Sequence, residues 1–267
     1  MINRYSFNYL FLIIAFLFFC GCHKKSIQDP PIYYPLQTKM DTAVLLVLGQ
    51  SNAANFGEST YAAKSRGTFN FYLGNYYPLA DPLLGAKGNK GSVWSRLGDT
   101  LIQKGFAKVL IIAPVAIGGT TLVQWKPGGI NNHLIVETIN ALQTKGLTIT
   151  HILWHQGESD HTIHNILMSA ADNATQYRNN FLELARQIRS LGVQAPIFTA
   201  IATQCSGMPA DTMLQKAQRD LSNDTMKIYT GPNTDSLGTE YRFDGCHFSN
   251  SGLLKHASLW SGILFTH

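Results

Sequence analysis

Residues 43–52 read Ala43-Val44-Leu45-Leu46-Val47-Leu48-Gly49-Gln50-Ser51-Asn52, an unbroken apolar run that ends in a glycine and three polar residues. Such a run is typical of a strand buried on both faces, as in a parallel sheet. A serine directly after the strand stands where the chain turns, and its hydroxyl can project above the sheet. Taken alone, a serine in this place is more often a helix cap than a nucleophile.

The rest of the chain repeats this pattern of short apolar runs separated by helical segments. We expect further strands at residues 108–113, 148–154, 196–202 and 226–229, and helices at 92–104, 132–145, 172–191, 211–221 and after Asn250. Asn250-Ser251 has the composition of an N-cap for the last helix. Alternating strands and helices predict a single α/β domain at residues 41–267, with a parallel sheet covered by helices on both faces.

Composition limits the classes of protein that the chain can belong to. It has 267 residues, of which 45% are apolar and 14% charged, with a formal net charge of +5. This excludes a disordered chain and predicts one sizeable core. No stripe of basic residues and no zinc-finger or RNA-binding motif is present, so we expect no nucleic-acid partner. Phosphate-binding glycine loops are also missing, which leaves nucleotide binding without support.

The N-terminus carries the pattern of an export signal. Arg4 precedes twelve apolar residues at 9–20, too few for a membrane-spanning helix, which needs about 20. Phe19-Cys20-Gly21-Cys22 resembles a bacterial lipoprotein cleavage box, with Phe19 in place of the usual leucine. We expect a signal peptide at 1–22, a lipid anchor at Cys22 as the only membrane contact, and a tether at 23–40 rich in Pro, Gln and Lys. A plain secretory signal or an uncleaved anchor is the alternative; each predicts an exported protein, in the cell envelope, periplasm or medium.

Polar residues with catalytic chemistry follow the other strands, at the sheet edge where sites of such folds lie. Gly118-Gly119 follows the second strand and allows a backbone N–H to approach a substrate oxygen, although a tight turn explains a lone pair of glycines equally well. Gln156 and Glu158 follow the third strand and offer an amide and a carboxylate. Asp244 and His247 follow the last strand, where the spacing of three lets the carboxylate orient the imidazole.

A metal site is the competing interpretation of the histidines in the third segment. His155, His161 and His164 lie close together in sequence, but the motif H-E-x-x-H is missing and no matching thiolates or carboxylates accompany them. We therefore expect surface or loop histidines, no bound metal and no cofactor.

Together the four segments resemble the SGNH hydrolase superfamily, and within it the sialate O-acetylesterase and acetylxylan esterase group. The matching segments are Gly49-Gln50-Ser51-Asn52, Gly118-Gly119-Thr120, Trp154-His155-Gln156-Gly157-Glu158-Ser159-Asp160 and Asp244-Gly245-Cys246-His247. They stand in the expected order over about 200 residues. The resemblance implies a three-layer α/β/α, flavodoxin-like fold and serine-esterase chemistry without a metal.

The resemblance also implies a role for each candidate residue. Ser51 is the nucleophile, His247 the general base and then acid, and Asp244 the residue that orients His247. The oxyanion is expected to bind the backbone N–H of Ser51, that of Gly118 or Gly119, and the Gln156 amide. Glu158 is the alternative partner of His247; we prefer Asp244 because the turn fixes its position, which leaves Glu158 a loop-orienting role.

The implied activity is removal of O-acetyl groups from a carbohydrate partner of the acetylxylan or sialic acid type. Two alternatives remain, an esterase that acts on a lipid or another small acyl ester, and a sugar-binding lipoprotein without activity. The presence of Ser51, Asp244 and His247 together argues against the binding protein.

Two further expectations concern the surroundings of the site. If Cys20 and Cys22 are processed, Cys205 and Cys246 are left as a disulfide or as two separate thiols. In the implied fold they follow neighbouring strands, which favours a disulfide beside the catalytic turn. A second set of residues is expected either to line a carbohydrate-binding face or to pack in the core, and it consists of Phe71, Tyr72, Tyr76, Tyr77 and Trp125.

Overall fold

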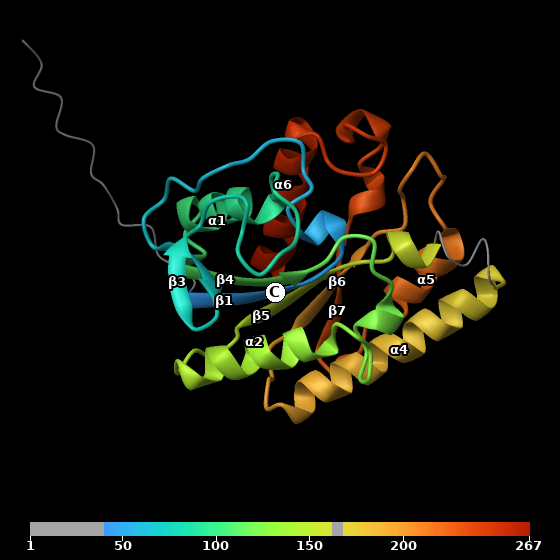
Figure 1. The fold of residues 1–267 in the computed structure, drawn as a ribbon, viewed down its shortest axis with the longest axis horizontal. Coiled ribbons are helices and arrows are strands. Elements are labelled where there is room, and N and C mark those ends of the chain that lie inside the picture. The colour runs from blue at the N-terminus through green and yellow to red at the C-terminus, as the bar shows by residue number, and fades with distance from the viewer. Residues whose placement is uncertain (1–39, 162–167) are drawn as a thin grey trace, which may run out of the picture. The chain divides into compact units, whose positions relative to one another are not determined.

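The computed structural model describes residues 40–161 and 168–267, and the expected signal peptide and the tether up to residue 39 lie outside these residues. A seven-stranded sheet runs through the domain in the order β3-β2-β4-β1-β5-β6-β7 (Figure 1). The strands are β1 (Met40–Gly49), β2 (Thr68–Tyr72), β3 (Asn75–Pro78), β4 (Ala107–Ala116), β5 (His151–His155), β6 (Ile197–Ile201) and β7 (Ile228–Asn233).

The five expected strands are all present, as β1, β4, β5, β6 and β7, and each pairs in parallel with its neighbours. The expected parallel sheet carries an antiparallel addition at one edge. There β2 and β3 form an antiparallel hairpin, and β2 pairs in parallel with β4. The sheet is therefore mixed, with a parallel centre.

All five expected helices are also present, as α1 (Val93–Gln103), α2 (Asn132–Thr144), α4 (Ala170–Ser190), α5 (Thr212–Arg219) and α6 (Asn250–Thr266). Side chains that accept backbone N–H groups begin four of them: Ser92 caps α1, Ser169 caps α4 and Asp211 caps α5. The cap of α6 is Ser249, which accepts from the N–H of Gly252 at 3.2 Å, so the expected cap at Asn250-Ser251 was placed one residue late. No helix within the described residues is long and apolar enough to cross a membrane.

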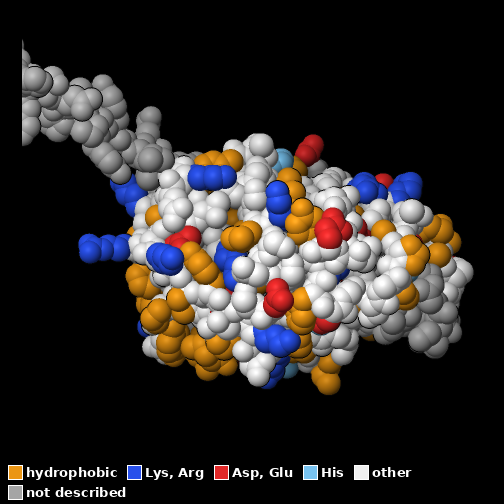
Figure 2. All heavy atoms as spheres, turned by 90° about the horizontal axis from the view of Figure 1, so that it is seen from above, with side chains coloured by type: hydrophobic (Ala, Val, Ile, Leu, Met, Phe, Trp, Pro, Cys, Tyr) orange, Lys and Arg blue, Asp and Glu red, His pale blue; other side chains and the backbone are white. Residues whose placement is uncertain are grey.

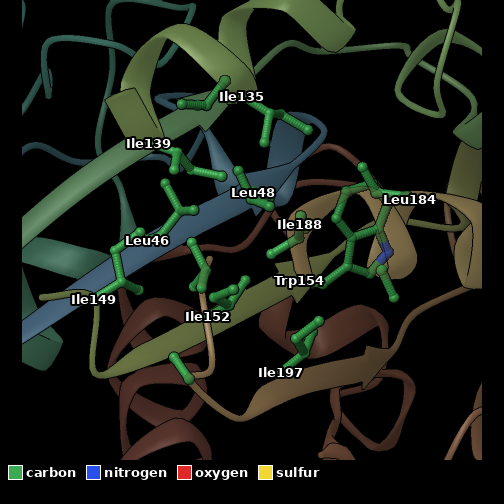
Figure 3. Packing of buried hydrophobic residues seen from close by; sticks show 14 of the residues in the cluster. Leu46, Leu48, Ile135, Ile139, Ile149, Ile152, Trp154, Leu184, Ile188 and Ile197 are labelled. Carbon is green, nitrogen blue, oxygen red and sulfur yellow. The ribbon is translucent and has the colours of Figure 1, made fainter. Parts of the chain in front are cut away.

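The helices cover both faces of the sheet. In Figure 1, α1 and α6 lie on one side, and α2, α4 and α5 lie on the other. Alternate residues of β1 enter the two cores: Leu45 packs on the α1–α6 side and Leu46 on the α2–α4 side. In Figure 3, Leu46 and Leu48 point toward Ile135 and Ile139 of α2, while Trp154 lies beside Leu184 of α4. This is the expected three-layer α/β/α arrangement.

The central strand β1 is where the strand order reverses, since the chain places β4 on one side of it and β5 on the other. Sheets of this kind bind ligands at the carboxyl ends of the strands next to such a reversal. The segments that follow β1, β4 and β5 therefore meet at one edge, and these are three of the four segments singled out in the sequence.

Candidate active site

The nucleophile candidate Ser51 stands on a sharp turn at the end of β1. Gly49 has a φ of +147°, and a Cβ atom there would lie 2.0 Å from the carbonyl oxygen of His155 on β5. The next residue donates its N–H to that same carbonyl at 3.1 Å. Ser51 then begins a short 3-10 helix (Ser51–Ala53) and is 5% exposed. Only glycine fits where β1 turns so close to β5, and the turn lifts Ser51 to the sheet edge.

Asp244 and His247 form a hydrogen-bonded pair in the turn before α6. The Nδ1 atom of His247 lies 2.7 Å from Oδ2 of Asp244. The other carboxylate oxygen accepts the backbone N–H groups of Cys246 at 3.0 Å and His247 at 2.7 Å. Partial burial raises the pKa of Asp244, but the hydrogen bonds from His247 and these N–H groups outweigh it, so the pKa is lowered overall. The carboxylate can thus fix the tautomer that leaves Nε2 free to accept a proton.

A disulfide and a buried arginine hold the turn that carries this pair. Cys246, next to His247, forms a disulfide with Cys205, which confirms the expected pairing. The buried guanidinium of Arg242 donates to the carbonyl oxygens of Cys246, Thr234 and Leu237. The backbone of the turn is therefore held by one covalent bond and by charge-assisted hydrogen bonds.

Glu158 is a buried carboxylate in contact with Asn52 and His155. It is 2% exposed, and its Oε1 accepts from Asn52 Nδ2 at 2.8 Å and lies 3.4 Å from Nε2 of His155. Burial alone would raise its pKa, but the contacts with His155 and Asn52 lower it to about 2. Glu158 is thus a buried carboxylate that supports the turn of Ser51, and the carboxylate in contact with His247 is that of Asp244.

Phe56 joins the glycine segment after β4 to His247. Its ring stacks on His247 with 5.3 Å between ring centroids. A Cβ atom at Gly118 would lie 2.8 Å from the same ring, so the Gly118 backbone packs directly against it. Gly119 has a φ of +73° and no neighbouring atom within 4 Å of a Cβ. The segment therefore reaches the histidine through one aromatic ring.

The Gln156 side chain, expected as an oxyanion donor, is engaged by internal acceptors in the structure. Its side chain is fully buried, and Nε2 donates to the carbonyl of Thr120 at 3.0 Å, to Gln50 Oε1 at 3.2 Å and to the Asp160 carboxylate. An amide group has two hydrogens, so three protein acceptors already engage both of them. In this arrangement Gln156 connects the segments after β1, β4 and β5.

The sequence from residue 41 to residue 260 matches the family model "Carbohydrate esterase, sialic acid-specific acetylesterase". The match covers nearly all of the described domain and all four segments discussed above. The chain belongs to this family.

Solved structures share the fold of this carbohydrate esterase domain. A protein of Arabidopsis thaliana has a TM-score of 0.69 at 19% identity, over 84% of this chain and 98% of that one. A GDSL-like lipase from Parabacteroides merdae gives 0.58 at 13% identity, over 87% and 99% of the two chains. The acetylxylan esterase Axe2 of Geobacillus stearothermophilus gives 0.54 at 14% identity, over 86% and 95%. At these identities the likeness concerns the fold. A search of curated protein sequences gives no match.

The histidines considered for a metal have internal partners in this esterase domain. His155 contacts Glu158, and Nδ1 of His161 lies 2.9 Å from the carbonyl oxygen of Thr203; His164 lies outside the described residues. Among residues 40–161 and 168–267, no group of three or more His, Cys, Asp or Glu is arranged to hold a metal ion. On the face shown in Figure 2, Lys and Arg side chains are interspersed with acidic and hydrophobic ones.

Of the aromatic residues expected to line a carbohydrate-binding face or to pack in the core, two are buried and two are exposed. Trp125 is fully buried and donates from Nε1 to Thr120 Oγ1 at 2.8 Å, and Phe71 is 1% exposed, so both are packing residues. Tyr72 and Tyr76, on the β2–β3 hairpin, are 36% and 47% exposed.

Sequence reasoning missed the supporting roles of three residues in this esterase. Asn52 and Phe56 lie in the segment after β1, and Arg242 begins the segment of the catalytic turn. Asn52 could have been noticed as a polar residue that follows a buried strand, where burial requires a partner. Phe56 and Arg242 carry no such signal, because their roles depend on contacts formed only in the fold.

Proposed function

We propose that this protein is a serine esterase that removes O-acetyl groups from a carbohydrate. The observation that carries the proposal is the 2.7 Å contact between Asp244 and His247, in a turn whose neighbouring Cys246 carbonyl accepts from Asn52, the residue after Ser51, at 3.4 Å. Membership of the carbohydrate esterase family and the fold shared with an acetylxylan esterase support an acetylated glycan as substrate.

The proposed reaction has two steps. In the first, the Ser51 hydroxyl attacks the acetyl carbonyl, His247 Nε2 accepts the hydroxyl proton, and the sugar oxygen leaves with that proton. In the second, His247 takes a proton from water, the water oxygen attacks the acetyl-enzyme, and acetic acid leaves as Ser51 regains a proton from His247; the acid then ionises to acetate in solution. Asp244 holds the Nδ1–H of His247 and stabilises the imidazolium formed in each step.

The negative charge that develops on the carbonyl oxygen needs preorganised donors. We assign the backbone N–H of Ser51 and that of Gly118 or Gly119 to this role. The Gln156 amide would join them only by giving up one of its internal acceptors. Removal of one such donor costs about 3–4 kcal/mol in other acyl-transfer enzymes.

We also propose that the protein is exported and anchored through Cys22. The disulfide between Cys205 and Cys246 supports this location, because such bonds persist in oxidising compartments outside the cytoplasm.

The decisive test is hydrolysis of p-nitrophenyl acetate by the full-length protein and by Ser51→Ala, followed by acetate release from acetylated xylooligosaccharides and O-acetylated sialic acids. We expect kcat to fall by about 10⁴-fold or more in the variant. Equal rates in the two proteins would exclude Ser51 as the nucleophile. Hydrolysis of p-nitrophenyl octanoate without any release of acetate would favour an esterase that acts on lipids. Sugar binding without hydrolysis of any ester would favour a sugar-binding protein.

A further inference from the structure

A cavity of about 380 Å³ lies outside the residues assigned to catalysis. Its walls come from the ends of β2 and β4, from residues 82–88 and from the exposed side of α2. The side chains that decide its chemistry are Phe71, Tyr72, Lys87, Ile117, Glu137 and Thr138.

The cavity is separated from the catalytic histidine by a single aromatic ring. Ile117 lines the cavity and directly precedes Gly118. Gly88 also lines it, and a Cβ atom there would lie 3.0 Å from the ring of Phe56. The same ring stacks on His247. The Phe56 ring therefore contacts both His247 and a residue of the cavity wall, which places the cavity next to the proposed catalytic turn.

The lining combines an apolar surface with a small number of polar groups. The partly exposed ring of Tyr72 provides flat hydrocarbon surface, and Thr138 adds a hydroxyl. Lys87 and Glu137 add one donor and one acceptor of opposite charge, from two different elements. A sugar ring has apolar C–H faces and a rim of hydroxyl groups, and such a lining offers partners for both, whereas an acyl chain would use only the apolar part.

The charges also bear on whether the sugar is neutral or acidic. Lys87 and Glu137 cancel, so the cavity has no net charge to attract a carboxylate. Two buried arginines lie against the segments of the site, and their guanidinium groups are occupied by internal acceptors. Arg96 donates to Ser59 and Asn250, and Arg242 donates to three backbone carbonyls. Neither guanidinium therefore presents a pair of N–H groups for the two-point hydrogen bonding that binds carboxylates well.

We propose that this cavity is a subsite for a neutral sugar unit adjoining the acetylated one, so that the substrate is a neutral oligosaccharide rather than an O-acetylated sialic acid. This inference rests on the carbohydrate esterase function proposed above.

A matched pair of substitutions on α2 tests the subsite. Thr138→Trp fills the cavity, whereas Asn140→Trp adds the same side chain on the exposed surface of the same helix, outside the lining. In the full-length protein we compare kcat/KM for an acetylated xylooligosaccharide with kcat/KM for p-nitrophenyl acetate. The ratio should fall about tenfold with Thr138→Trp, the equivalent of one lost sugar contact, and stay unchanged with Asn140→Trp.

A second readout separates failure of the subsite from failure of the proposed function. Binding of deacetylated xylotetraose, followed by broadening of its NMR lines, should be lost in Thr138→Trp and retained in Asn140→Trp. If the native protein deacetylates glycans and the two variants behave alike, the subsite is wrong while the function stands. If the native protein cleaves no glycan ester, the function is wrong, and xylotetraose binding still decides the subsite. Preferential loss of p-nitrophenyl octanoate hydrolysis, or faster turnover of O-acetylated sialic acid than of the neutral substrate, would overturn the proposal.

Discussion

Asn52 donates a 2.8 Å hydrogen bond to the carboxylate of Glu158, although 106 residues separate the two in the sequence. The same Nδ2 atom lies 3.4 Å from the carbonyl oxygen of Cys246. One amide group therefore connects three segments: the turn of the nucleophile, the loop after β5 and the turn of the histidine. We therefore expect Asn52 to act as a positioning residue, which holds the turn of Ser51 against the turn of His247.

Replacement of Asn52 by alanine should reduce kcat for p-nitrophenyl acetate by about 10- to 100-fold, because small displacements of a catalytic pair are costly. KM should change little, since no substrate contact is removed. The free energy of unfolding should also fall, by about 1–3 kcal/mol, because the buried Glu158 loses a donor. Steady-state kinetics and urea unfolding measure the two effects, with the exposed Asn140→Ala as control. A change in KM alone would argue against a positioning role.

Asp244→Asn should separate the two functions of this carboxylate. An asparagine oxygen can still accept the N–H groups of Cys246 and His247, so the turn should remain folded. The amide cannot fix the same His247 tautomer, and we expect kcat to fall by about 10³- to 10⁴-fold. Asp244→Ala should lose the turn contacts as well, and stability with them. If Asp244→Asn kept native activity, another acid would have to orient His247.

The buried carboxyl of Asp160 should make stability depend on pH in an unusual direction. Burial, together with the nearby charge of Glu158, raises its pKa to about 7, although hydrogen bonds from Gln156 and from the N–H of Leu122 oppose the shift. An unfolded aspartate has a pKa of about 3.9. Between these values the folded chain holds a proton that the unfolded chain has lost. The free energy of unfolding therefore falls as pH rises, by up to about 1.4 kcal/mol per pH unit from this group.

Urea unfolding of the native protein and of Asp160→Asn, from pH 4.5 to pH 7.5, measures this contribution as a difference. The free energy of unfolding of Asp160→Asn, relative to that of the native protein, should rise with pH and become constant above pH 7. The exposed Asp224→Asn serves as control and should show no such trend. A pH-independent difference between the native protein and Asp160→Asn would mean that Asp160 is ionised throughout.

Gly49 should tolerate no side chain. Alanine there would bring its Cβ to 2.0 Å from the carbonyl oxygen of His155, so β1 and β5 would have to separate. We expect the free energy of unfolding to fall by roughly 3 kcal/mol or more, together with loss of activity. Gly146 also has a positive φ, of +71°, but nothing lies within 4 Å of a Cβ there. Gly146→Ala should cost only the backbone strain of about 1–2 kcal/mol. If both substitutions lowered the free energy of unfolding equally, the loss at Gly49 would come from backbone strain and not from the contact with His155.

The parallel centre of the sheet could be predicted because each of its strands is a continuous apolar run with a helix after it. The β2–β3 hairpin could not, for a reason visible in its turn. Leu73 and Gly74 form the two-residue connection with φ values of +46° and +77°. Hairpin turns of this kind ordinarily place Asn, Asp or Gly at both positions. A leucine at the first of them hides the turn from any reading based on residue preferences.

The candidate site likewise contains contacts that the sequence could predict and contacts that it could not. Asp244 and His247 are three residues apart, so a single turn suffices to pair them, and the sequence could predict that contact. The support beneath them depends on Glu158 and Asn52, which meet only when β1 and β5 lie side by side. Gln156 was assigned by its position in the motif, but its three internal acceptors come from segments whose approach the motif does not encode.

The bond between Cys205 and Cys246 has a consequence for when the enzyme becomes competent. A newly made chain that is still in the reducing cytoplasm carries two thiols at these positions, so only hydrogen bonds hold the segment of His247. If the protein is exported and acts on glycans as proposed, oxidation after export would complete the proposed active site as the last step of maturation. Acetylated metabolites inside the producing cell would then meet only the reduced, incomplete hydrolase, and full activity would be reached only outside the cytoplasm.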